Sequence, residues 1–581
     1  MCKLSQNETH IERVGNRMII FDMEVFKYDF ILCWLDTKTR KKYCIVNDTD
    51  AIKRFYEHYK NDIMVGYNSR GYDQWILKSI LCDFNPWDMN DWIINKDRKG
   101  YEFSRLLNKF PIRNYDCSVG FRSLKELEAF MGDDIRESSV PWDIDRKLTE
   151  EEIRDTLKYC YHDVDEAFRV FVETKEEFES HIGLIQEFDL GVENISKTKA
   201  QLSALILGAS KVNRNDEFDI RLPETLDMGQ YDWIREWYLK WAKDDRNYET
   251  MSLTTEINGV PHTFGIGGLH GSRDNYYGEG LYLMADVASY YPALMIEYDY
   301  LSRNVINKDK FRQIRDERMV MKQAKDPRQQ PRKIVLNSTF GASKDQYNNL
   351  YDPLQANNIC IAGQLLLVDL LDKLDGKCEL IQSNTDGILV KLYNESDKQM
   401  ILDICKEWSD RTRMELEFEE YVKVIQKDVN NYIIVDNCGG VKRKGAFVKK
   451  LNALDNDLPI VNRAVVSYFV SGTPVEQTVN SSNLLIDFQK VTKVSSKYDY
   501  AVHNGVVLSE KVHRCFASTR DTDGTLYKKH KNKTTLDKTG GTPERCFINN
   551  SRIVGEEVPS YLDREWYIEL AKDRIKKFLE G

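Results

Sequence analysis

The segment MIIFDMEVF, residues 18–26, constrains the fold of this 581-residue chain more than any other feature. Its apolar residues indicate a buried strand, which Asp22 and Glu24 interrupt. Side chains two positions apart share one face of a strand, so both carboxylates point the same way. A bound divalent cation would relieve their mutual repulsion and the cost of burying them. An edge strand with solvated acids explains this segment alone equally well.

The pattern along the chain indicates several domains. Alternating strand-like and helical runs fill about the first 180 residues and indicate an α/β unit. The segment LTEEEIRDTLKYCYHDVDEAFRVFVE has a helical apolar stripe and begins with a predicted capping box, Thr149 and Glu152. A glycine-rich turn, FGIGGLHGS, precedes two short helical stretches with Pro327 and Pro331 between them. From about Ala446 the chain mixes strands and helices, and it ends in a predicted amphipathic helix, DREWYIELAKDRIKKFLE.

Composition is that of an ordinary soluble protein, with 41% hydrophobic and 30% charged residues. The net charge of −10 does not suggest a nucleic-acid binder, although acidic catalytic sites lower the total. The opening segment MCKLSQNETH does not resemble an apolar leader, and no long apolar run exists, so we expect a cytoplasmic protein without a membrane partner. The 12 cysteines lack zinc-site spacing and are predicted to be reduced thiols, with no zinc bound.

Two further fragments extend the first carboxylate pair. The fragment GYNSRGYDQWIL offers Asn68, Tyr72 and Asp73 ahead of an apolar helix. The long helix offers Tyr159 and Asp163, which are neighbours on its surface because they lie four positions apart.

Together these fragments resemble the DEDD exonuclease superfamily in its tyrosine version, with D-x-E, N-x(2,3)-[FY]-D and Y-x3-D in order. Tyr161 and Asp165 also satisfy the last motif, and helical periodicity does not separate the two registers. We choose Tyr159 and Asp163 because family members usually place the apolar helix directly after that Asp. The resemblance implies that Tyr159 orients the attacking water. It also implies that two metal ions are held by Asp22, Glu24, Asp73 and Asp163.

Four residues resemble the single-strand DNA contacts of phage polymerase exonuclease domains. They are Asn68, Tyr72 and, in the segment SLKEL, Ser123 and Leu124. A helix N-cap explains Ser123 at least as well.

A second carboxylate set follows in the middle of the chain. The segment LYLMADVASYYPALMIE is a second apolar strand that ends in Asp286. It resembles motif A of family B DNA polymerases, D-x-x-S-L-Y-P, with Tyr290 in place of Leu. RKIVLNSTFGA resembles motif B, K-x3-N-S-x-Y-G, with Phe340 in place of Tyr. SNTDGILV falls in the place of motif C, D-T-D-S, with Asn384 in place of its first Asp, and FGIGGLHGS resembles the Y-x-G-G segment of phage enzymes.

The motifs are in the expected order over most of residues 15–450, so the chain resembles family B DNA polymerases, and most of all the compact phage-encoded members. The resemblance implies an α/β and α+β multidomain fold, in which an RNase H-like exonuclease domain precedes a right-hand polymerase with palm, fingers and thumb. The implied regions are the exonuclease (1–185), the linker and first part of the palm (186–310), short helical fingers (311–345), the second part of the palm (346–445), and the thumb or C-terminal DNA-binding region (446–581).

The resemblance assigns the polymerase metals to Asp286 and Asp386, with the backbone carbonyl of Val287 completing the nucleotide-bound ion. Two Mg²⁺ ions per active site are implied, with Mn²⁺ as a substitute. Asn384 matches the motif C Asp that contributes less to coordination. Its neutral side chain lowers the local repulsion, and we expect it to weaken metal binding when no nucleotide is present.

Nucleotide contacts are implied on two helices and at the strand end. Lys333 and Asn337 lie four positions apart on one predicted helix and would face the triphosphate. Arg318 and Lys322 have the same spacing on the other helix and are candidates for the outer phosphates; Arg315 competes with them, and solvated helix charges are the alternative. Tyr291 matches the steric gate that rejects a 2′-hydroxyl.

DNA contacts are implied at Gly267 and Gly268 of the glycine-rich turn, at Gly341, at Tyr432 and at Lys444. Asn430 stands where a primer-contacting Lys is expected, and Lys427 could compensate for it. A surface loop that makes no DNA contact explains Lys444 nearly as well. The basic loop YKKHKNK, with Lys528, Lys529, Lys531 and Lys533, is predicted to contact duplex phosphates.

These resemblances imply a template- and primer-dependent DNA polymerase with a proofreading 3′–5′ exonuclease, which replicates a phage genome in the host cytoplasm. Its partners would be primer-template DNA, dNTPs and a single-stranded 3′ end, and we expect a monomer. The intervals from Asp286 to Lys333 and from Gly341 to Asp386 leave no room for the insertions of protein-primed phage enzymes, so we expect extension of an oligonucleotide primer and weak strand displacement. Large cellular members have longer fingers and a further N-terminal domain, which we do not find. The alternative is an exonuclease whose degenerate polymerase domain only binds DNA.

Overall fold

The structure is a computed structural model that describes residues 17–445 and 447–580. The segment MCKLSQNETH and Ala446, on which two of the predictions above fall, lie outside the described residues. Contacts between residues divide the mixed α/β chain into two compact units. Unit 1 comprises Met1–Lys197, Leu451–Ile460 and Ser482–Tyr567, and unit 2 comprises Thr198–Lys450, Val461–Ser481 and Ile568–Gly581.

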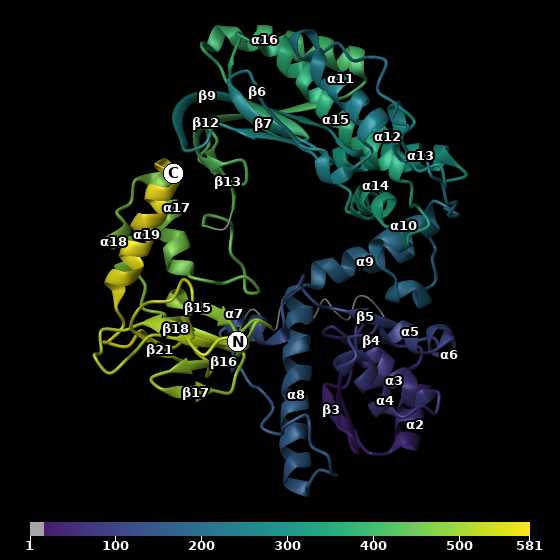
Figure 1. Cartoon of the computed structure of the whole chain (residues 1–581), viewed down its shortest axis with the longest axis vertical. Coiled ribbons are helices and arrows are strands. Elements are labelled where there is room, and N and C mark those ends of the chain that lie inside the picture. The colour runs from purple at the N-terminus through teal and green to yellow at the C-terminus, as the bar shows by residue number, and fades with distance from the viewer. Residues whose placement is uncertain (1–16, 446, 581) are drawn as a thin grey trace. The chain divides into compact units, whose positions relative to one another are not determined.

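The N-terminal part of unit 1 is a five-stranded sheet with helices packed on it, coloured purple to blue in Figure 1. The strand order is β3-β2-β1-β4-β5, in which β1 is antiparallel to β2 and parallel to β4. The strands are β1 (Met18–Val25), β2 (Phe30–Asp36), β3 (Lys41–Val46), β4 (Ile63–Gly66) and β5 (Asn114–Asp116). The helices are α2 (Thr49–Tyr59), α3 (Asp73–Leu81), α4 (Pro86–Asn90), α5 (Gly100–Phe103), α6 (Arg105–Lys109), α7 (Leu124–Met131), α8 (Glu150–Glu173) and α9 (Lys175–Glu187).

Local sequence signals explain the two elements that carry the first acids. The apolar start of β1 is almost fully buried, as expected for a strand packed on both faces. Helix α8 begins at the predicted capping box, in which the backbone N–H of Glu152 donates to Thr149 Oγ1 at 3.2 Å and Thr149 N–H donates back to Glu152 Oε2 at 2.8 Å. Because α8 packs against β1 and β2, it brings its inner face to the acids of β1.

The predicted region 446–581 is divided between the two units, and its assignment as a thumb remains a prediction. The strands of this region that belong to unit 1 contact the loop after α7. There the buried guanidinium of Arg514 donates to the carbonyl oxygen of Asp133 at 2.7 Å. The strands form two small sheets, β15 (Lys490–Lys493), β18 (Val512–Ala517) and β21 (Cys546–Ile548), and β17 (Val506–Leu508), β16 (Tyr498–His503), β19 (Tyr527–His530) and β20 (Leu536–Lys538). The remaining C-terminal helices are α17 (Pro459–Ser471), α18 (Val475–Ser481) and α19 (Arg564–Leu579).

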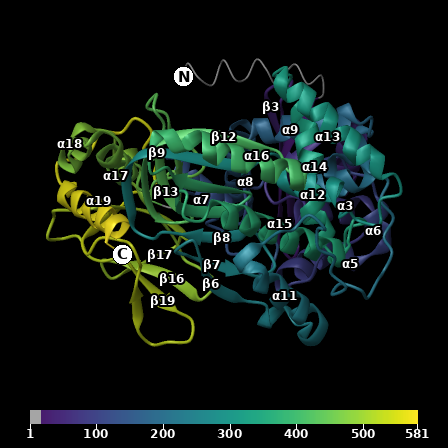
Figure 2. The same ribbon diagram turned by 90° about the horizontal axis from the view of Figure 1, so that it is seen from above.

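Unit 2 is built on a nine-stranded sheet of order β14-β13-β12-β9-β11-β10-β8-β7-β6. Its two longest strands, β9 and β12, pair antiparallel and lie side by side in Figure 2. The strands are β6 (Leu253–Ile257), β7 (Val260–Phe264), β8 (Leu269–Ser272), β9 (Tyr276–Val287), β10 (Glu379–Thr385), β11 (Gly387–Lys391), β12 (Leu416–Asp428), β13 (Asn431–Val435) and β14 (Val441–Lys444). The helices are α10 (Lys199–Ile206), α11 (Asp232–Lys240), α12 (Tyr290–Glu297), α13 (Lys308–Gln323), α14 (Gln329–Lys344), α15 (Pro353–Leu374) and α16 (Lys398–Thr412).

Two helices of unit 2 bear on the sequence predictions: α14 on the expected break at Pro331, and α15 on the expected lack of a long apolar run. Pro331 was expected between the two helical stretches, but it lies in the first turn of α14, where the missing N–H of proline costs no helical hydrogen bond. Among the described residues, α15 is the one helix long and apolar enough to cross a membrane, and its apolar window is wholly buried, as in a core helix.

Candidate active sites

The four acids predicted for the first site converge on β1. Asp22 and Glu24 lie on one face of β1. Asp73 is the first residue of α3, and its Oδ1 accepts a hydrogen bond from the backbone N–H of Met23 at 3.1 Å. Asp163, on α8, is near enough to Asp22 and Glu24 for its negative charge to raise the pKa of both.

Burial, together with repulsion between neighbouring carboxylates, raises the pKa of these acids. Burial is the main reason why the pKa of Asp22 is raised to about 7, and the charge of Asp163 adds to it. Burial also raises the pKa of Glu24, Asp73 and Asp163. Four carboxyl groups with raised pKa values are a donor set of hard oxygens, which is the chemistry that Mg²⁺ and Mn²⁺ fit.

The structure separates the two registers that the Y-x3-D motif allows. Asp163 is 8% exposed and belongs to the cluster of acids. Asp165 lies on another face of α8, where its half-exposed carboxylate pairs with Lys42 at 2.5 Å. The ring of Tyr161 also lies near Lys42, with 5.9 Å between the ring centroid and Nζ. Only the register of Tyr159 and Asp163 therefore faces β1.

Sequence reasoning missed a buried lysine in this site. Lys125, on α7, places its Nζ 2.6 Å from Asp163 Oδ1 and 2.9 Å from Glu128 Oε1. The same Nζ lies 4.7 Å from the ring centroid of Tyr159. Lys125 is the middle residue of the segment SLKEL, which the motif search singled out. Nothing within that segment indicates that the ammonium of Lys125 contacts a carboxylate on α8.

Cys160 is a second residue that the sequence reading did not assign. Its Sγ donates to Asp22 Oδ2 at 3.4 Å and forms, with Asp22 and Glu24, a group of three ligand atoms close enough to hold one ion. All the cysteines within the described ranges are free, in agreement with the expected reduced thiols.

The predicted single-strand contacts are spread around the acids. Tyr72 donates from its hydroxyl to Asn90 Oδ1 at 2.7 Å. Asn68 is exposed at a left-handed backbone position, with φ of 55°, and its N–H donates to Asp116 Oδ1 at 3.0 Å. Ser123 is the N-cap of α7 and forms a capping box with Glu126, as the alternative interpretation expected, and Leu124 begins that helix.

The two acids of the second site meet on neighbouring strands. In the antiparallel pair of β9 and β11, Asp286 lies opposite Gly387, the residue after Asp386. The backbone N–H of Val287 donates to the carbonyl oxygen of Asp386 at 2.7 Å. Both acids line one pocket of about 200 Å³, together with Gln382, Asn384, Tyr432 and Lys442, among others. Two residues distant in the sequence thus share one small polar pocket.

The electrostatics of this pocket resemble those of the first site. Burial is the main cause that raises the pKa of Asp286 to about 6; Lys442 opposes the shift, and the charge of Asp386 adds to it. Burial also raises the pKa of Asp386. Lys442, which the sequence reading did not assign, places its Nζ 3.2 Å from Glu419 Oε2. The oxygen donors again suit a hard divalent cation.

Glycines allow the close approach of chain segments at this pocket. A Cβ added to Gly387 would lie 1.8 Å from Asp286 Oδ1, and one added to Gly268 would lie 2.5 Å from Thr385 Oγ1. Thr385 itself has a left-handed backbone, with φ of 59°, which turns the chain into Asp386. The carbonyl oxygen of Gly267 accepts from Gln364 Nε2 at 2.9 Å. The glycine-rich turn therefore packs directly against the turn at Thr385 and Asp386.

The predicted nucleotide contacts lie in two different environments. Tyr291 is half-buried, and its ring centroid lies 4.4 Å from that of Phe340. Lys333 and Asn337 are both exposed on α14, and Gly341 faces open space.

Arg318 and Lys322 both contact other residues of unit 2, although Arg318 is buried and Lys322 is exposed. Arg318 is 8% exposed, and its Nη1 donates to Ser289 Oγ at 2.5 Å. Lys322 Nζ lies 2.5 Å from Glu417 Oε1, and Glu417 is the cross-strand neighbour of Asp286. Arg315, their competitor, lies 2.6 Å from Asp316 Oδ1.

The predicted primer contacts lie at the edge of the sheet. Tyr432 is buried and lines the pocket of Asp286 and Asp386, and Lys444 is its exposed cross-strand neighbour on β14.

Comparisons with known proteins add a distant likeness in fold. No family model and no curated protein sequence matches the chain. Among solved structures, the chain is similar to the family B DNA polymerase from the hyperthermophilic archaeon Pyrobaculum calidifontis. The identity is 14% and the TM-score is 0.42, with 97% of this chain and 78% of that chain covered.

Proposed function

We propose that the chain is a template- and primer-dependent DNA-directed DNA polymerase with a proofreading 3′–5′ exonuclease. The observation that carries this proposal is the pocket shared by Asp286 and Asp386, which come from motifs distant in the sequence. The convergence of Asp22, Glu24, Asp73 and Asp163 in unit 1 supports the exonuclease.

Both sites would hold two divalent ions, Mg²⁺ or in its place Mn²⁺, because their donors are carboxylate oxygens with raised pKa values. In unit 2 the ligands would be Asp286, Asp386 and the carbonyl of Val287. In unit 1 they would be Asp22, Glu24, Asp73 and Asp163. Bound ions of this kind activate the attacking oxygen and stabilise the leaving oxygen.

In the polymerase reaction, the 3′-hydroxyl of the primer forms a bond to the α-phosphorus of a dNTP, and the bond to the β-phosphate breaks to release pyrophosphate. Lys333 and Asn337, exposed on α14, would bind the triphosphate. Tyr291, held against Phe340, would collide with a 2′-hydroxyl. Arg318 and Lys322 would have to leave Ser289 and Glu417 to reach the outer phosphates.

In the exonuclease reaction, water attacks the terminal phosphodiester, the bond to the 3′ oxygen breaks, and a nucleoside 5′-monophosphate leaves. Tyr159 would orient the water beside Asp163. Lys125 would hold Asp163 in place, since its ammonium is 2.6 Å from that carboxylate. The single strand would contact Asn68, Tyr72, Ser123 and Leu124, and primer-template DNA would contact Gly267, Gly268, Gly341, Tyr432 and Lys444.

A phage-encoded enzyme of this kind would act as a monomer in the host cytoplasm and replicate the phage genome from an oligonucleotide primer. The second candidate is an exonuclease with a degenerate polymerase domain that binds DNA. Asn384 in motif C and the engaged side chains of Arg318 and Lys322 favour it. The acids at 286 and 386 and the exposed Lys333 favour a working polymerase.

One gel assay tests the proposal. A matched and a mismatched labelled primer on a template are incubated with Mg²⁺, with and without dNTPs. We expect extension of the matched primer with dNTPs, shortening of both primers without them, and removal of the mismatch before extension. Shortening in every lane with no extension would leave the exonuclease alone. If the primers are neither extended nor shortened, the proposal is overturned.

A further inference from the structure

An ion pair joins helix α13 to the strand beside Asp286. Lys322 Nζ, on α13, lies 2.5 Å from Glu417 Oε1, on β12. Glu417 is directly opposite Asp286 in the antiparallel pair of β12 and β9. Residues directly opposite each other on paired strands have their side chains on the same face of the sheet. The carboxylate that binds Lys322 therefore lies on the face that carries the carboxylate of Asp286.

Arg318 is a buried cation four positions before Lys322 on the same helix. The residue is 8% exposed, and its Nη1 donates to Ser289 Oγ at 2.5 Å. Its Nε is buried and has no hydrogen-bond partner among the described residues. Burial lowers the pKa of Arg318, and the negative charge of Glu417 opposes this shift. Glu417 therefore acts on both cations of α13.

These two cations share one acid. Arg318 and Lys322 carry two positive charges and Glu417 carries one negative charge, so a more highly charged anion is attracted to them more strongly than a single carboxylate. Oxygens of carboxylates and of phosphates accept charge-assisted hydrogen bonds from the same ammonium and guanidinium groups. The outer phosphates of a nucleoside triphosphate would therefore compete with Glu417 for the Nζ of Lys322.

We propose that Glu417 is an internal competitor of the nucleotide. Its carboxylate binds Lys322 when no nucleotide is present, and the outer phosphates displace it. The inference rests on the proposed polymerase, because the triphosphate is the substrate of that reaction. Glu417 sets the affinity for the nucleotide and takes no part in the chemical step.

The first experiment measures the binding of inorganic tripolyphosphate by calorimetric titration, without divalent ions and without DNA. E417Q should bind it about 2- to 5-fold more tightly than the wild type, the range that an exposed ion pair supplies. In K322M, where no ammonium is left to release, adding E417Q should bring no gain. Equal affinity of E417Q and the wild type, or the same gain with and without Lys322, would overturn the proposal.

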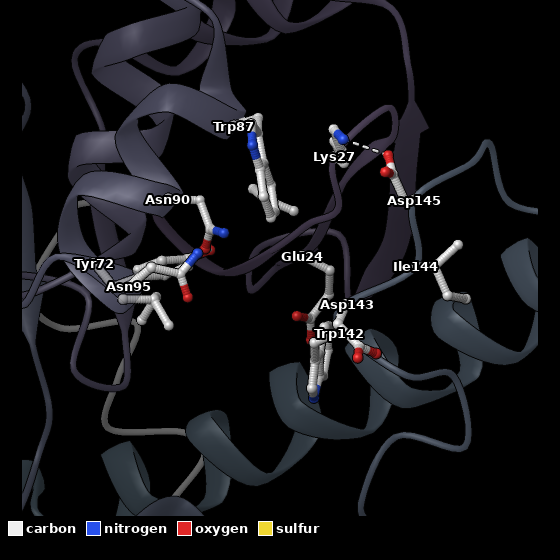
Figure 3. A pocket seen from close by; sticks show the side chains of 12 residues that line it. Glu24, Lys27, Tyr72, Trp87, Asn90, Asn95, Trp142, Asp143, Ile144 and Asp145 are labelled. Atoms are coloured by element: carbon white, nitrogen blue, oxygen red, sulfur yellow. Dashed lines mark hydrogen bonds and ion pairs between the residues drawn. The ribbon is translucent and has the colours of Figure 1, made fainter.

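Two controls each remove the acid of another lysine ion pair. E420Q acts on the same strand, because Glu420 lies on the other face of β12 and pairs with Lys398 at 2.5 Å. D145N acts in unit 1, where Asp145 and Lys27 line the cavity beside Glu24 and form the ion pair that is the dashed line in Figure 3. Both variants should bind tripolyphosphate like the wild type. A gain in either of them as large as in E417Q would show a general effect of charge and would overturn the proposal.

The second experiment measures incorporation of a single dNTP on a matched primer-template with Mg²⁺. The KM of E417Q for the dNTP should be about 2- to 5-fold lower than that of the wild type, at an unchanged kcat. Tripolyphosphate binding that responds to E417Q in a chain that extends no primer would refute the polymerase but not the competition. Extension with an unchanged KM in E417Q would refute the competition alone.

Discussion

At the scale of single residues, Asp22 shows how the first site sets its own pH dependence. Its pKa is raised from 3.8 to about 7, chiefly by burial. An acid with a higher pKa in the folded than in the unfolded state holds its proton better when folded. Stability that is present below about pH 4 is therefore lost as the pH rises toward 7 in metal-free protein.

Replacing Asp22 by Asn removes this cost. At pH 8 without divalent ions, D22N should unfold with a free energy higher than the wild type by on the order of 2–4 kcal/mol, and the two should be alike near pH 4. Calorimetric melting at both pH values measures this. D165N is the control, because Asp165 pairs with Lys42 at the surface. Equal melting temperatures of D22N and wild type at pH 8 would contradict the claim that ionised Asp22 destabilises the metal-free protein.

Asn384 gives a second prediction at this scale. It lines the pocket of Asp286 and Asp386, and it lies opposite His270 on β8. Asp at this position adds a negative charge to the pocket, so N384D should reach half-maximal nucleotide incorporation at a lower Mg²⁺ concentration than the wild type. Incorporation is measured across a Mg²⁺ titration, with N437D, at an exposed position of the same unit, as the control. An unchanged Mg²⁺ requirement counts against a role for Asn384.

Gly387 leaves room for the carboxylate of Asp286 on the neighbouring strand. G387A would place a Cβ 1.8 Å from Asp286 Oδ1, so the carboxylate or the strand has to move. We expect incorporation to fall at least 100-fold, since a displacement of about 1 Å at reacting groups costs that much. G540A, where an added Cβ meets open space, is the control. Wild-type incorporation by G387A would mean that this position of Asp286 is not required.

At the scale of elements, helix α7 carries charged residues that support the first carboxylate site. It carries Lys125, which pairs with Asp163 of α8, and Glu128, which is fully buried. Arg514 of β18 donates to the carbonyl oxygens of Ala129 and Asp133 at the end of α7. The C-terminal strands of unit 1 therefore hold the helix that holds Asp163.

Removing Lys125 leaves two buried acids without their cation. K125M should destabilise unit 1 by about 3–5 kcal/mol and lower the exonuclease rate. Thermal melting and degradation of a labelled single strand measure the two effects. K158M, which removes a surface lysine of α8 paired with Asp155, should change stability by less than about 0.5 kcal/mol. Equal stability of K125M and wild type would show that Asp163 needs no partner.

Elements with local signals could be predicted, and contacts between distant elements could not. The strands that carry Asp22 and Asp286, and the cap of α8, follow from apolar runs and a capping box. The pairing of Lys125 with Asp163 depends on how α7 meets α8, which no pattern within either helix encodes. Arg318 was predicted as a phosphate contact, with a solvated helix charge as the alternative, and its burial could not be predicted for the same reason, because only the packing of α13 buries it against Ser289.

At the scale of the whole molecule, the two carboxylate sites lie in different compact units. Each compact unit contains its own carboxylate site, in which burial raises the pKa of the acids. The two sites have no residue in common. A substitution in the site of unit 2 should therefore abolish polymerisation while 3′–5′ degradation persists. A substitution in the site of unit 1 should have the opposite effect.

The most direct test of the central claim is nucleotide incorporation by D386N, measured with a matched primer-template, Mg²⁺ and a single dNTP. We predict that incorporation falls at least 1,000-fold, while degradation of a single strand by the same preparation stays within about twofold of the wild type. The retained degradation shows that unit 1 of the variant is folded, and a thermal melt like that of the wild type is the control for unit 2. Incorporation by D386N at the wild-type rate would contradict the claim that the acids at 286 and 386 together form the polymerase site.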